Sequence, residues 1–539
     1  MSDPERIGVT HALTKIRVQP YLRAVRARRT SLEAFARRVG HAIDTATVTA
    51  SDLVGCRYRY PQRLAHPEIP RLPAELERRE RLAAARAAVQ AALPTRRALG
   101  DGRGARPFVR IDLADTPGVE LETLEALAAG ADLITGAVFS GVGWRVRVDV
   151  LALTADGTYL PVTVSNHRAA RRDEGSTMLA VATNRLSLSA PMAVPYRHRH
   201  HVSDGYRLAM ASRALAEFGL DSGLGGVIGQ DRTRAFVAET AGLQPALDDA
   251  LRAGWADQPR RLKECASCRF WELCEPELET MDDISLVLPG DKARTYRERG
   301  ITTVQELIDA RLGEPSALAT AWRAGLPLLA RVPEITGPRA DVEIDVDMEA
   351  YLDQGAYLWG AYDGRDYRGF VTWAPLGGAE EAANFAEFWS WLMQRRRAAH
   401  ESGQSFAAYC YSAHGENHWL RQSARRFHGK HRGVPSEAEV QEFITSGDWV
   451  DVFAHVRSQL AGTEGTGLKI VAREAGYAWA DGDFDGEASV GARRTAVATG
   501  PEALAAREAL LRYNEDDTRA TAAVRGWLRD GAPGVQPIS

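Results

Sequence analysis

An acidic stretch in the second half of the chain has the spacing of a metal-binding strand. From Val342 to Glu349, apolar and acidic residues alternate one for one. If this stretch is a β-strand, the apolar side chains take one face and the carboxylates take the other, because successive side chains point to opposite faces. Neighbouring carboxylates repel one another, and a divalent cation would compensate their charge better than a solvated edge would. The carboxylates on the shared face are Glu343, Asp345, Asp347 and Glu349.

Acidic residues farther along the chain could complete such a site. Tyr513 and Asp517 are four residues apart in an expected helix, so they lie on the same helix face. Glu416 comes just after a short expected strand, and Asp451 lies in the segment Trp-Val-Asp-Val-Phe. Scattered surface acids are the alternative interpretation of this set.

An acidic first strand, an acidic residue after a central strand and Tyr-x-x-x-Asp on a late helix resemble the DEDD exonucleases of the ribonuclease H-like fold, specifically the YprB-type domain. The resemblance covers about residues 342 to 528 and includes the step Leu468-Lys469 before Ala-Arg-Glu-Ala-Gly. It implies phosphodiester hydrolysis with two ions of Mg²⁺ or Mn²⁺.

The same resemblance implies roles for individual residues. Tyr513 would orient the attacking water, and the metal ligands would be Asp347, Glu349, Glu416 and Asp517. The first motif can also be Asp345-x-Asp347, but we prefer Asp347-x-Glu349 because Asp-x-Glu is the usual spacing in the family. Asp345 and Asp451 therefore remain candidate ligands.

Three of the five cysteines are clustered, and a fourth stands far upstream. Cys265, Cys268 and Cys274 have the spacing C-x2-C-x5-C, whereas Cys56 is isolated. The upstream thiolate can join the trio only if the intervening residues fold into a domain that brings its ends together. A structural zinc site, which would more often use two local pairs of ligands, and four inert buried thiols are the alternatives. Cys410 is expected to be a buried core thiol.

One distant cysteine and a clustered trio resemble the cluster-bearing RecB-type nucleases, including the AddB-like and CRISPR-associated relatives. The resemblance implies that the four cysteines ligate a [4Fe-4S] cluster. It also places Asp149 at the metal-binding aspartate of a PD-(D/E)xK site, whose next strand should carry Glu-x-Lys. Thr163 and Ser165 occupy those positions, and no lysine occurs between positions 16 and 262. We therefore expect a degenerate site, with Asp149 either a relic or an ordinary strand residue.

Regular elements are expected around both groups of residues. Residues 144–150 and 159–165 alternate as strands about an Asp-Gly turn, which predicts a hairpin. The run from Arg197 to His201, Arg-His-Arg-His-His, is expected to be a solvated or phosphate-facing loop. Helices are expected at 73–93, 380–399 and 501–529, and further strands at 342–349, 357–360, 369–373 and 406–411.

The chain changes character at residues 284–312, between the two halves. Leu-Pro-Gly290 separates two helical stretches, and Thr303 and Glu306 form a capping box. The pattern resembles a helix-hairpin-helix element, whose glycine turn presents backbone N–H groups to a phosphate. A plain helical spacer fits this short pattern equally well.

Length and composition exclude several classes of protein. A chain of 539 residues is too long for one ordinary core, which excludes a single small binding module. With 45% hydrophobic and 26% charged residues, most of the chain should fold rather than stay disordered. The formal charge of -4 does not mark a nucleic-acid binder, although local basic stretches could hold phosphate. Without a signal-peptide pattern or a long apolar run, we expect a cytoplasmic protein that does not bind membranes.

The predicted fold class is a multidomain α/β protein. Its expected parts are an N-terminal helical segment (1–45), a degenerate RecB-like iron-sulfur domain (46–278), a helix-hairpin-helix-like region with a linker (279–340), a ribonuclease H-like domain (341–530) and a disordered tail (531–539).

The combination resembles the RecB-like nuclease family. It implies a metal-dependent nuclease, an exonuclease of 3'-5' polarity, that acts on DNA in preference to RNA in repair or recombination. No G-x-x-x-x-G-K-[ST] motif occurs, so any helicase that works with the chain must be a separate protein. The alternative is a non-catalytic nucleic-acid-binding or scaffold protein in which both nuclease folds have decayed.

Overall fold

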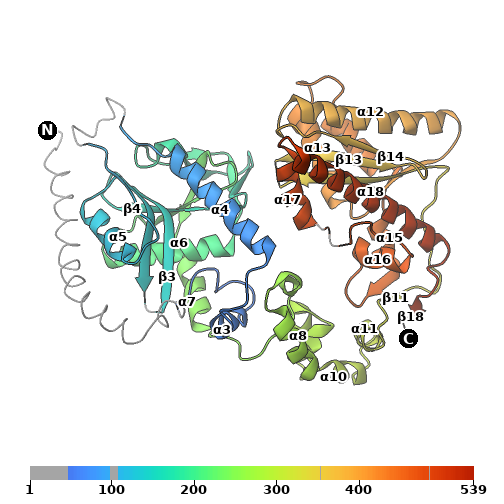
Figure 1. The fold of residues 1–539 in the computed structure, drawn as a ribbon, viewed down its shortest axis with the longest axis horizontal. Coiled ribbons are helices and arrows are strands. Elements are labelled where there is room, and N and C mark those ends of the chain that lie inside the picture. Colours follow the sequence, from blue (N-terminus) through green and yellow to red (C-terminus); the bar gives the residue numbers. More distant parts are fainter. Residues whose placement is uncertain are drawn as a thin grey trace. The chain divides into compact units, whose positions relative to one another are not determined.

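A computed structural model describes residues 47–97 and 107–538, apart from residues 142, 353, 483 and 485. The chain divides into two compact units, with the boundary between Glu277 and Leu278 (Figure 1), and each unit is described by itself. The helix expected at 1–45 lies outside the described residues. Among the helices that are described, none is long and apolar enough to cross a lipid bilayer.

The N-terminal unit is built on an eight-stranded mixed sheet. Helices α5 (Val119–Ala128) and α6 (Val202–Glu217) pack on one face of this sheet, and α4 (Pro73–Ala92) packs on the other. In spatial order the strands are β1 (Arg110–Asp112), β2 (Leu133–Gly141), β3 (Trp144–Leu153), β4 (Tyr159–Val164), β9 (Leu224–Ile228), β10 (Arg234–Glu239), β6 (Met178–Ala182) and β7 (Met192–Val194).

The hairpin predicted from the sequence is confirmed as the pair β3 and β4. The strands pair antiparallel with Val150 opposite Val162, and Gly157 in the turn adopts a φ of 84°. Such a φ favours glycine, because a side chain would clash with the backbone. Strand β4 then pairs in parallel with β9.

The expected loop at 197–201 is partly wrong, because its first residues form a strand. Strand β8 (Tyr196–His198) pairs antiparallel with β5 (Ala170–Arg172) in a two-stranded ribbon outside the main sheet. The Tyr196 ring packs against Phe236 of β10, with ring centroids 5.1 Å apart. The polar residues of this run do not reveal the packing of Tyr196 on Phe236. This tertiary contact supports the strand conformation of the first residues of the run.

Short helices open the second unit. The predicted capping box is confirmed at α10 (Val304–Asp309), where the Thr303 side chain accepts from the backbone N–H of Glu306 and the Glu306 carboxylate accepts from that of Thr303. The single turns η4 (Ile284–Leu286) and η5 (Gly290–Ala293) and helix α9 (Arg294–Arg297) precede it, and α11 (Glu314–Arg323) follows.

The C-terminal sheet has five strands and a mixed topology. Its central strand, β12 (Val342–Tyr351), pairs antiparallel with β13 (Gly355–Tyr362) and parallel with β15 (Phe406–Cys410). The outer strands are β14 (Tyr367–Val371) beside β13 and β16 (Trp449–Asp451) beside β15. All four strands predicted for this part of the chain are confirmed, with small differences at their ends.

Helices cover both faces of this sheet (Figure 1). Ile344 and Val346 of β12 pack under α12 (Ala379–Glu401) and α13 (His414–Phe427), together with α14 (Glu437–Thr445). The opposite face packs against α15 (Val452–Gln459), α16 (Leu468–Glu474), α17 (Gly486–Ala496) and α18 (Pro501–Arg529). Because the apolar residues of β12 face α12, its acidic residues lie under α18.

The tail at 531–539, which was expected to be disordered, contains a short strand in the structure. Strand β18 (Gln536–Pro537) pairs in parallel with β11 (Leu328–Ala330), which also pairs antiparallel with β17 (Leu460–Gly462). The free edge of β11 offers backbone hydrogen bonds to the tail, and the backbone N–H of Ile538 donates to the carbonyl of Ala330 at 2.9 Å. Residue 539 lies outside the described chain.

Candidate metal centre

The four acidic residues on β12 divide into two pairs according to what they face on α18. Arg525 forms a bidentate hydrogen bond to Asp345, with distances of 2.8 and 2.6 Å, and an ion pair with Glu343 at 2.9 Å. Arg529 also binds Glu343, and although burial opposes ionisation, the two arginines hold the pKa of Glu343 at about 2. The candidate ligand Asp345 is therefore occupied by an arginine in a buried ion pair.

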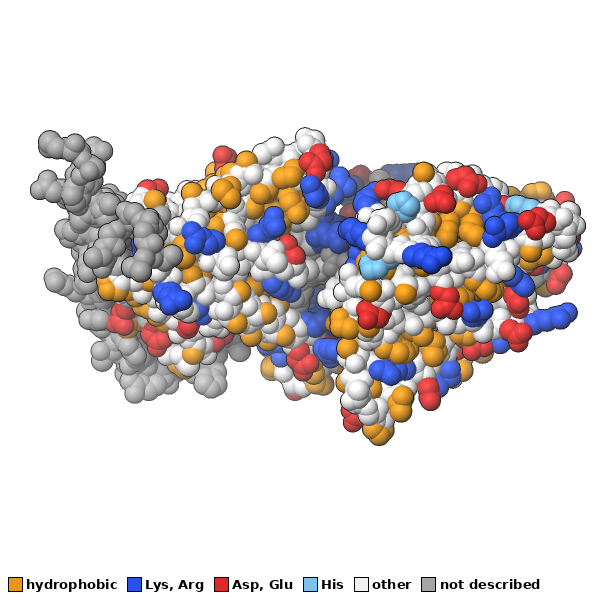
Figure 2. Space-filling model, turned by 90° about the horizontal axis from the view of Figure 1, so that it is seen from above, with side chains coloured by type: hydrophobic (Ala, Val, Ile, Leu, Met, Phe, Trp, Pro, Cys, Tyr) orange, Lys and Arg blue, Asp and Glu red, His pale blue; other side chains and the backbone are white. Residues whose placement is uncertain are grey.

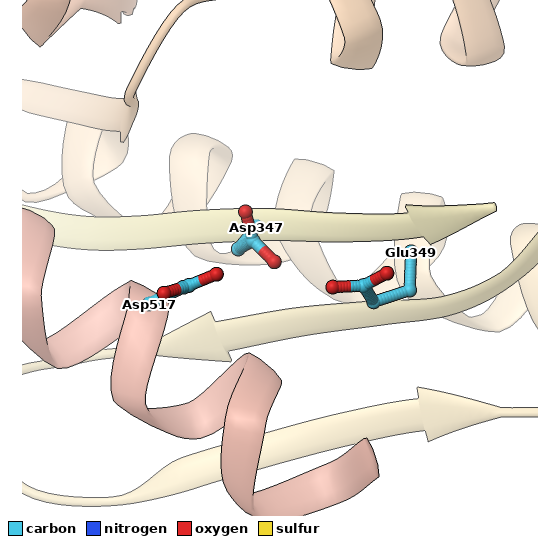
Figure 3. Close-up of side chains that lie close together, drawn as sticks. All are labelled: Asp347, Glu349 and Asp517. Atoms are coloured by element: carbon cyan, nitrogen blue, oxygen red, sulfur yellow. The ribbon is translucent and has the colours of Figure 1, made fainter. Parts of the chain in front are cut away.

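The second pair lies farther along the same strand and faces no arginine. Asp347 and Glu349 of β12 meet Asp517 of α18, and one carboxylate oxygen from each lies within 4.8 Å of those of the other two. Figure 3 shows the three side chains converging from the strand and the helix. Within the described chain, this is the one group of three or more His, Cys, Asp or Glu side chains that meets this distance.

Burial and mutual repulsion raise the pKa values of these carboxyl groups. Burial and the charge of Asp517 raise the pKa of Glu349 to about 8. Burial, Asp517 and Glu349 raise the pKa of Asp347 well above its usual range. The pKa of Asp517 rises by burial to about 6. A divalent cation would remove the repulsion that disfavours the charged forms, so this donor set fits a hard cation such as Mg²⁺ or Mn²⁺.

Asn514, which the sequence interpretation did not single out, holds Asp347 in place. Its side-chain amide donates to Asp347 Oδ2 at 2.6 Å, and its Oδ1 accepts from the hydroxyl of Tyr367 at 2.7 Å. Gly360 lies opposite Asp347 on β13, where a Cβ atom would come within 1.7 Å of Asn514 Oδ1. Only glycine at position 360 leaves room for this amide.

Asp517 has partners that favour its charged form. The indole N–H of Trp479 donates to Asp517 Oδ1 at 2.8 Å, and Lys469 and a hydrogen bond from Tyr513 also lower its pKa. The Lys469 ammonium lies 5.6 Å from the Tyr513 ring centroid. These contacts bring Lys469 and Tyr513, both singled out from the sequence, to the same carboxylate.

Glu416 and Asp451 lie near the group but outside it. Glu416, on α13, is buried, its Oε2 has no hydrogen-bond partner among the described atoms, and burial raises its pKa to about 8. Its charge reaches Asp347 and Glu349 and raises both pKa values. Asp451 caps α15, where its Oδ1 accepts from the backbone N–H groups of Ser412 and Phe453 at 3.0 Å.

In the N-terminal unit, Asp149 is bound by arginines. Arg86 of α4 lies 2.6 Å from Asp149 Oδ1, and Arg207 of α6 lies 3.9 Å from Oδ2. Thr163 donates to the same Oδ2 at 3.3 Å, and Ser165 is buried at the end of β4. The position of the expected RecB-type metal ligand thus carries a carboxylate that is neutralised by cations of the chain itself.

The N-terminal unit brings Cys56 close to the cysteine trio. The backbone N–H of Cys56 donates to Glu264 at 2.7 Å, across 208 residues of sequence. Burial, together with Cys268, Cys56 and Cys265, raises the pKa of Cys274 to about 12, so the four thiols lie within electrostatic range of one another. No three of these sulfur atoms lie mutually within 4.8 Å. The expectation for Cys410 is confirmed, since it is fully buried in the C-terminal core.

Of the comparisons with known proteins, one assigns a region of the C-terminal unit. A search of curated proteins and a search of solved structures each gave no match. Residues 345–529 match the RNase H superfamily. The matched region contains all three clustered carboxylates. It also contains the five-stranded sheet except for the first three residues of β12. The C-terminal part of this chain is therefore a domain of the RNase H superfamily.

Proposed function

We propose that the chain is a metal-dependent nuclease, an exonuclease acting on DNA in repair or recombination, whose active site lies in the RNase H superfamily domain. The observation that carries the proposal is the group of Asp347, Glu349 and Asp517, whose carboxylate oxygens lie within 4.8 Å of one another without an arginine between them. A fold of this superfamily with such a group has the parts that phosphodiester hydrolysis requires.

Each residue has a role in this proposal. Asp347, Glu349 and Asp517 would hold the cation, and Glu416, with its unpartnered buried oxygen, would be a further ligand. A bound divalent ion would supply charge stabilisation to the phosphate and a more acidic water. Burial and the charge of Asp517 hold the pKa of Tyr513 far above its usual range, so its hydroxyl stays protonated and can orient the attacking water.

A nuclease assay tests this function. The full chain should release nucleotides from end-labelled DNA with Mg²⁺ or Mn²⁺, and EDTA should stop the reaction. Asp517→Asn should lower turnover by a factor of about 100 or more, because it weakens the cation site. Arg512→Gln, an exposed change on the same helix, serves as the matched control. If no single- or double-stranded DNA or RNA is cut with either metal, the non-catalytic scaffold function takes its place.

We also propose that Cys56, Cys265, Cys268 and Cys274 bind a [4Fe-4S] cluster. The hydrogen bond from Cys56 to Glu264 and the mutual electrostatic influence of the thiols support this proposal.

Anaerobic purification tests the cluster. The protein should contain iron and sulfide and absorb as a brown iron-sulfur species, and Cys56→Ser should lose both the colour and the iron. Cys410→Ala is the control, because this thiol lies in the C-terminal core. Stoichiometric zinc without iron would overturn the proposal.

We further propose that the N-terminal unit is a degenerate PD-(D/E)xK domain and that residues 284–312 act as a helix-hairpin-helix-like contact to DNA. The first is supported by the ion pair of Asp149 with Arg86, which occupies the carboxylate that a metal would need. The second is supported by the capping box at Thr303 and the glycine turn at Gly290, which has a φ of 65°. A helicase acting with the nuclease would be a separate protein.

A further inference from the structure

The ribbon of β5 and β8 carries a row of arginines on one face. In an antiparallel pair, directly opposite residues share a face, and Arg171 of β5 lies opposite Arg197 of β8. Arg199, two residues after Arg197, is on the same face by alternation. All three side chains are exposed, and none forms an ion pair within the described chain. We call Arg171, Arg197 and Arg199 the basic ribbon face.

The other face of the ribbon holds it against the N-terminal core. Ala170 is buried, and the Tyr196 ring packs on Phe236. The backbone N–H of Arg199 donates to the carbonyl of Ala169 at 2.9 Å, which extends the pairing beyond β8. The basic ribbon face is therefore fixed in position rather than carried by a loose loop.

Two acidic residues near the ribbon have partners of their own. Glu174 pairs with Arg172 at 2.8 Å, and the Asp173 carboxylate accepts from Gly175 and Ser176 within its own turn. Like charges placed directly opposite one another on a ribbon destabilise the pairing. A polyanion lying along the ribbon would relieve this repulsion.

The ribbon is joined to the elements that surround Asp149. Strand β4, which carries Thr163, leads into β5, and β8 leads into α6, which carries Arg207. The rings of His167 and His201, one in each connection, stack with centroids 3.9 Å apart. Arg207 in turn donates to Thr163 at 3.1 Å. The ribbon is thus connected on both sides to the elements that hold the neutralised carboxylate of Asp149.

We propose that the basic ribbon face binds the phosphodiester backbone of a nucleic acid directly, without a metal ion. Guanidinium groups bind phosphate oxygens in a bidentate manner, and the backbone positions of Arg197 and Arg199 are about 7 Å apart by a strand rise of roughly 3.3 Å per residue. The spacing suits successive phosphates of one strand. This inference goes beyond the proposed function, because it concerns the N-terminal unit and requires no cleavage.

The test is binding of the full chain to DNA in EDTA, where no divalent ion is present. A fluorescein-labelled single strand of about 30 nucleotides is long enough for a site of this kind. The variant Arg171→Gln/Arg197→Gln/Arg199→Gln should bind about tenfold more weakly at low salt. The slope of log K against log[salt] should become shallower by about 2, because each phosphate contact on a single strand contributes roughly 0.7.

The matched control removes three exposed arginines elsewhere in the same unit: Arg71→Gln/Arg185→Gln/Arg252→Gln. It makes the same change in net charge and should keep both the affinity and the salt slope. Equal losses of DNA affinity in the two triple variants would overturn the proposal. So would an unchanged DNA affinity in the variant that lacks Arg171, Arg197 and Arg199. So would competition by poly-glutamate as effective as that by unlabelled DNA of equal charge.

The outcome is independent of the proposed nuclease function. If the basic ribbon face carries binding and the chain cuts nothing, this inference stands and the nuclease fails. If the chain cuts DNA but the two triple variants bind alike, the nuclease stands and this inference fails.

Discussion

At the scale of single residues, the role of an acidic side chain on β12 depends on its partner from α18. Glu343 and Asp345 meet Arg525 and are neutralised. Asp347 and Glu349 have the same residue chemistry on the same strand face, but they meet an asparagine and a third carboxylate. The first pair fastens the helix to the strand, whereas a divalent cation would relieve the mutual repulsion of the carboxylates around the second pair.

Asn514→Ala should weaken the metal site although Asn514 is not one of its carboxylates. The change removes the hydrogen bond that orients Asp347 and leaves the Tyr367 hydroxyl unpaired. Loss of such an orienting contact typically lowers metal affinity or activity by about 10 to 100-fold. Titration of Mn²⁺ by calorimetry, together with turnover, measures the effect.

Gly360→Ala should also lower the Mn²⁺ affinity, because the added Cβ would displace the Asn514 amide that positions Asp347. Gly526→Ala, in open space on α18, is the control and should leave metal binding unchanged. Normal Mn²⁺ affinity in both Asn514→Ala and Gly360→Ala would show that Asn514 does not position Asp347.

Metal binding should strengthen as the pH rises to about 8. The pKa values of Glu349 and Glu416 are raised to about 8, so a cation must displace protons at lower pH. For the metal-free protein the sign is opposite: a raised pKa in the folded state stabilises the fold at low pH, and this stability is lost as the pH rises through about 8. In EDTA the unfolding temperature should therefore fall between about pH 5 and pH 8 and change little at higher pH.

The pH experiment has an internal control in Glu349→Gln, which should make both pH dependences shallower, because the amide cannot titrate while Glu416 still does. The two profiles are obtained by thermal unfolding with EDTA and with saturating Mg²⁺. A Mg²⁺ affinity that is constant across this pH range in the wild type would contradict the assignment of these carboxyl groups.

At the scale of elements, the match between α18 and β12 sets the site. The eight residue-to-residue steps from Asp517 to Arg525 span about 12 Å of helix at roughly 1.5 Å per residue. The four steps from Asp345 to Glu349 span about 13 Å of strand at roughly 3.3 Å per residue. The ion pair at one end of this stretch therefore places Asp517 opposite Asp347 and Glu349 at the other.

Arg525→Met should destabilise the C-terminal domain by about 3 to 5 kcal/mol, because it leaves Asp345 buried without its partner. Urea unfolding followed by tryptophan fluorescence should show a lower midpoint. Arg519→Met, which breaks a half-exposed pair with Glu515 on the same helix, should cost less than about 1 kcal/mol. Equal midpoints for the two variants would show that the buried pair does not anchor the helix.

Local patterns predicted the elements of this domain and many of its candidate residues. Alternation revealed β12, and helical spacing placed Tyr513 and Asp517 on one face. The roles of Asp345 and Asn514 could not be predicted, because their partners lie 180 and 167 residues away in sequence. One clue to Asn514 was available: it stands three residues before Asp517, which places it on the same helix face.

At the scale of the whole molecule, the two units differ in what surrounds their buried acidic residues. The C-terminal domain brings three carboxylates together, whereas the N-terminal unit surrounds Asp149 with Arg86, Arg207 and Thr163. Thr163 and Ser165 led us to predict from the sequence that Asp149 does not belong to a working metal site. The arginines beside Asp149 could not be inferred, since they lie on α4 and α6.

Asp149→Asn in the full chain should leave the cleavage rate per folded molecule unchanged, because Asp149 is paired with Arg86 and binds no catalytic metal ion in the proposed function. Turnover is compared with the wild type after correction for the folded fraction by circular dichroism. Abolished cleavage in a folded Asp149→Asn protein would place catalysis in the N-terminal unit instead.

The central claim is that Asp347, Glu349 and Asp517 together hold a divalent cation. A crystal grown with Mn²⁺ tests it most directly, because the anomalous signal of manganese identifies the ion and its position. We expect an anomalous peak for an ion that is bound by all three carboxylates in the wild type, and no peak at this position in Asp517→Asn. A peak at Asp149, or wild-type crystals saturated with Mn²⁺ that show none between β12 and α18, would contradict it.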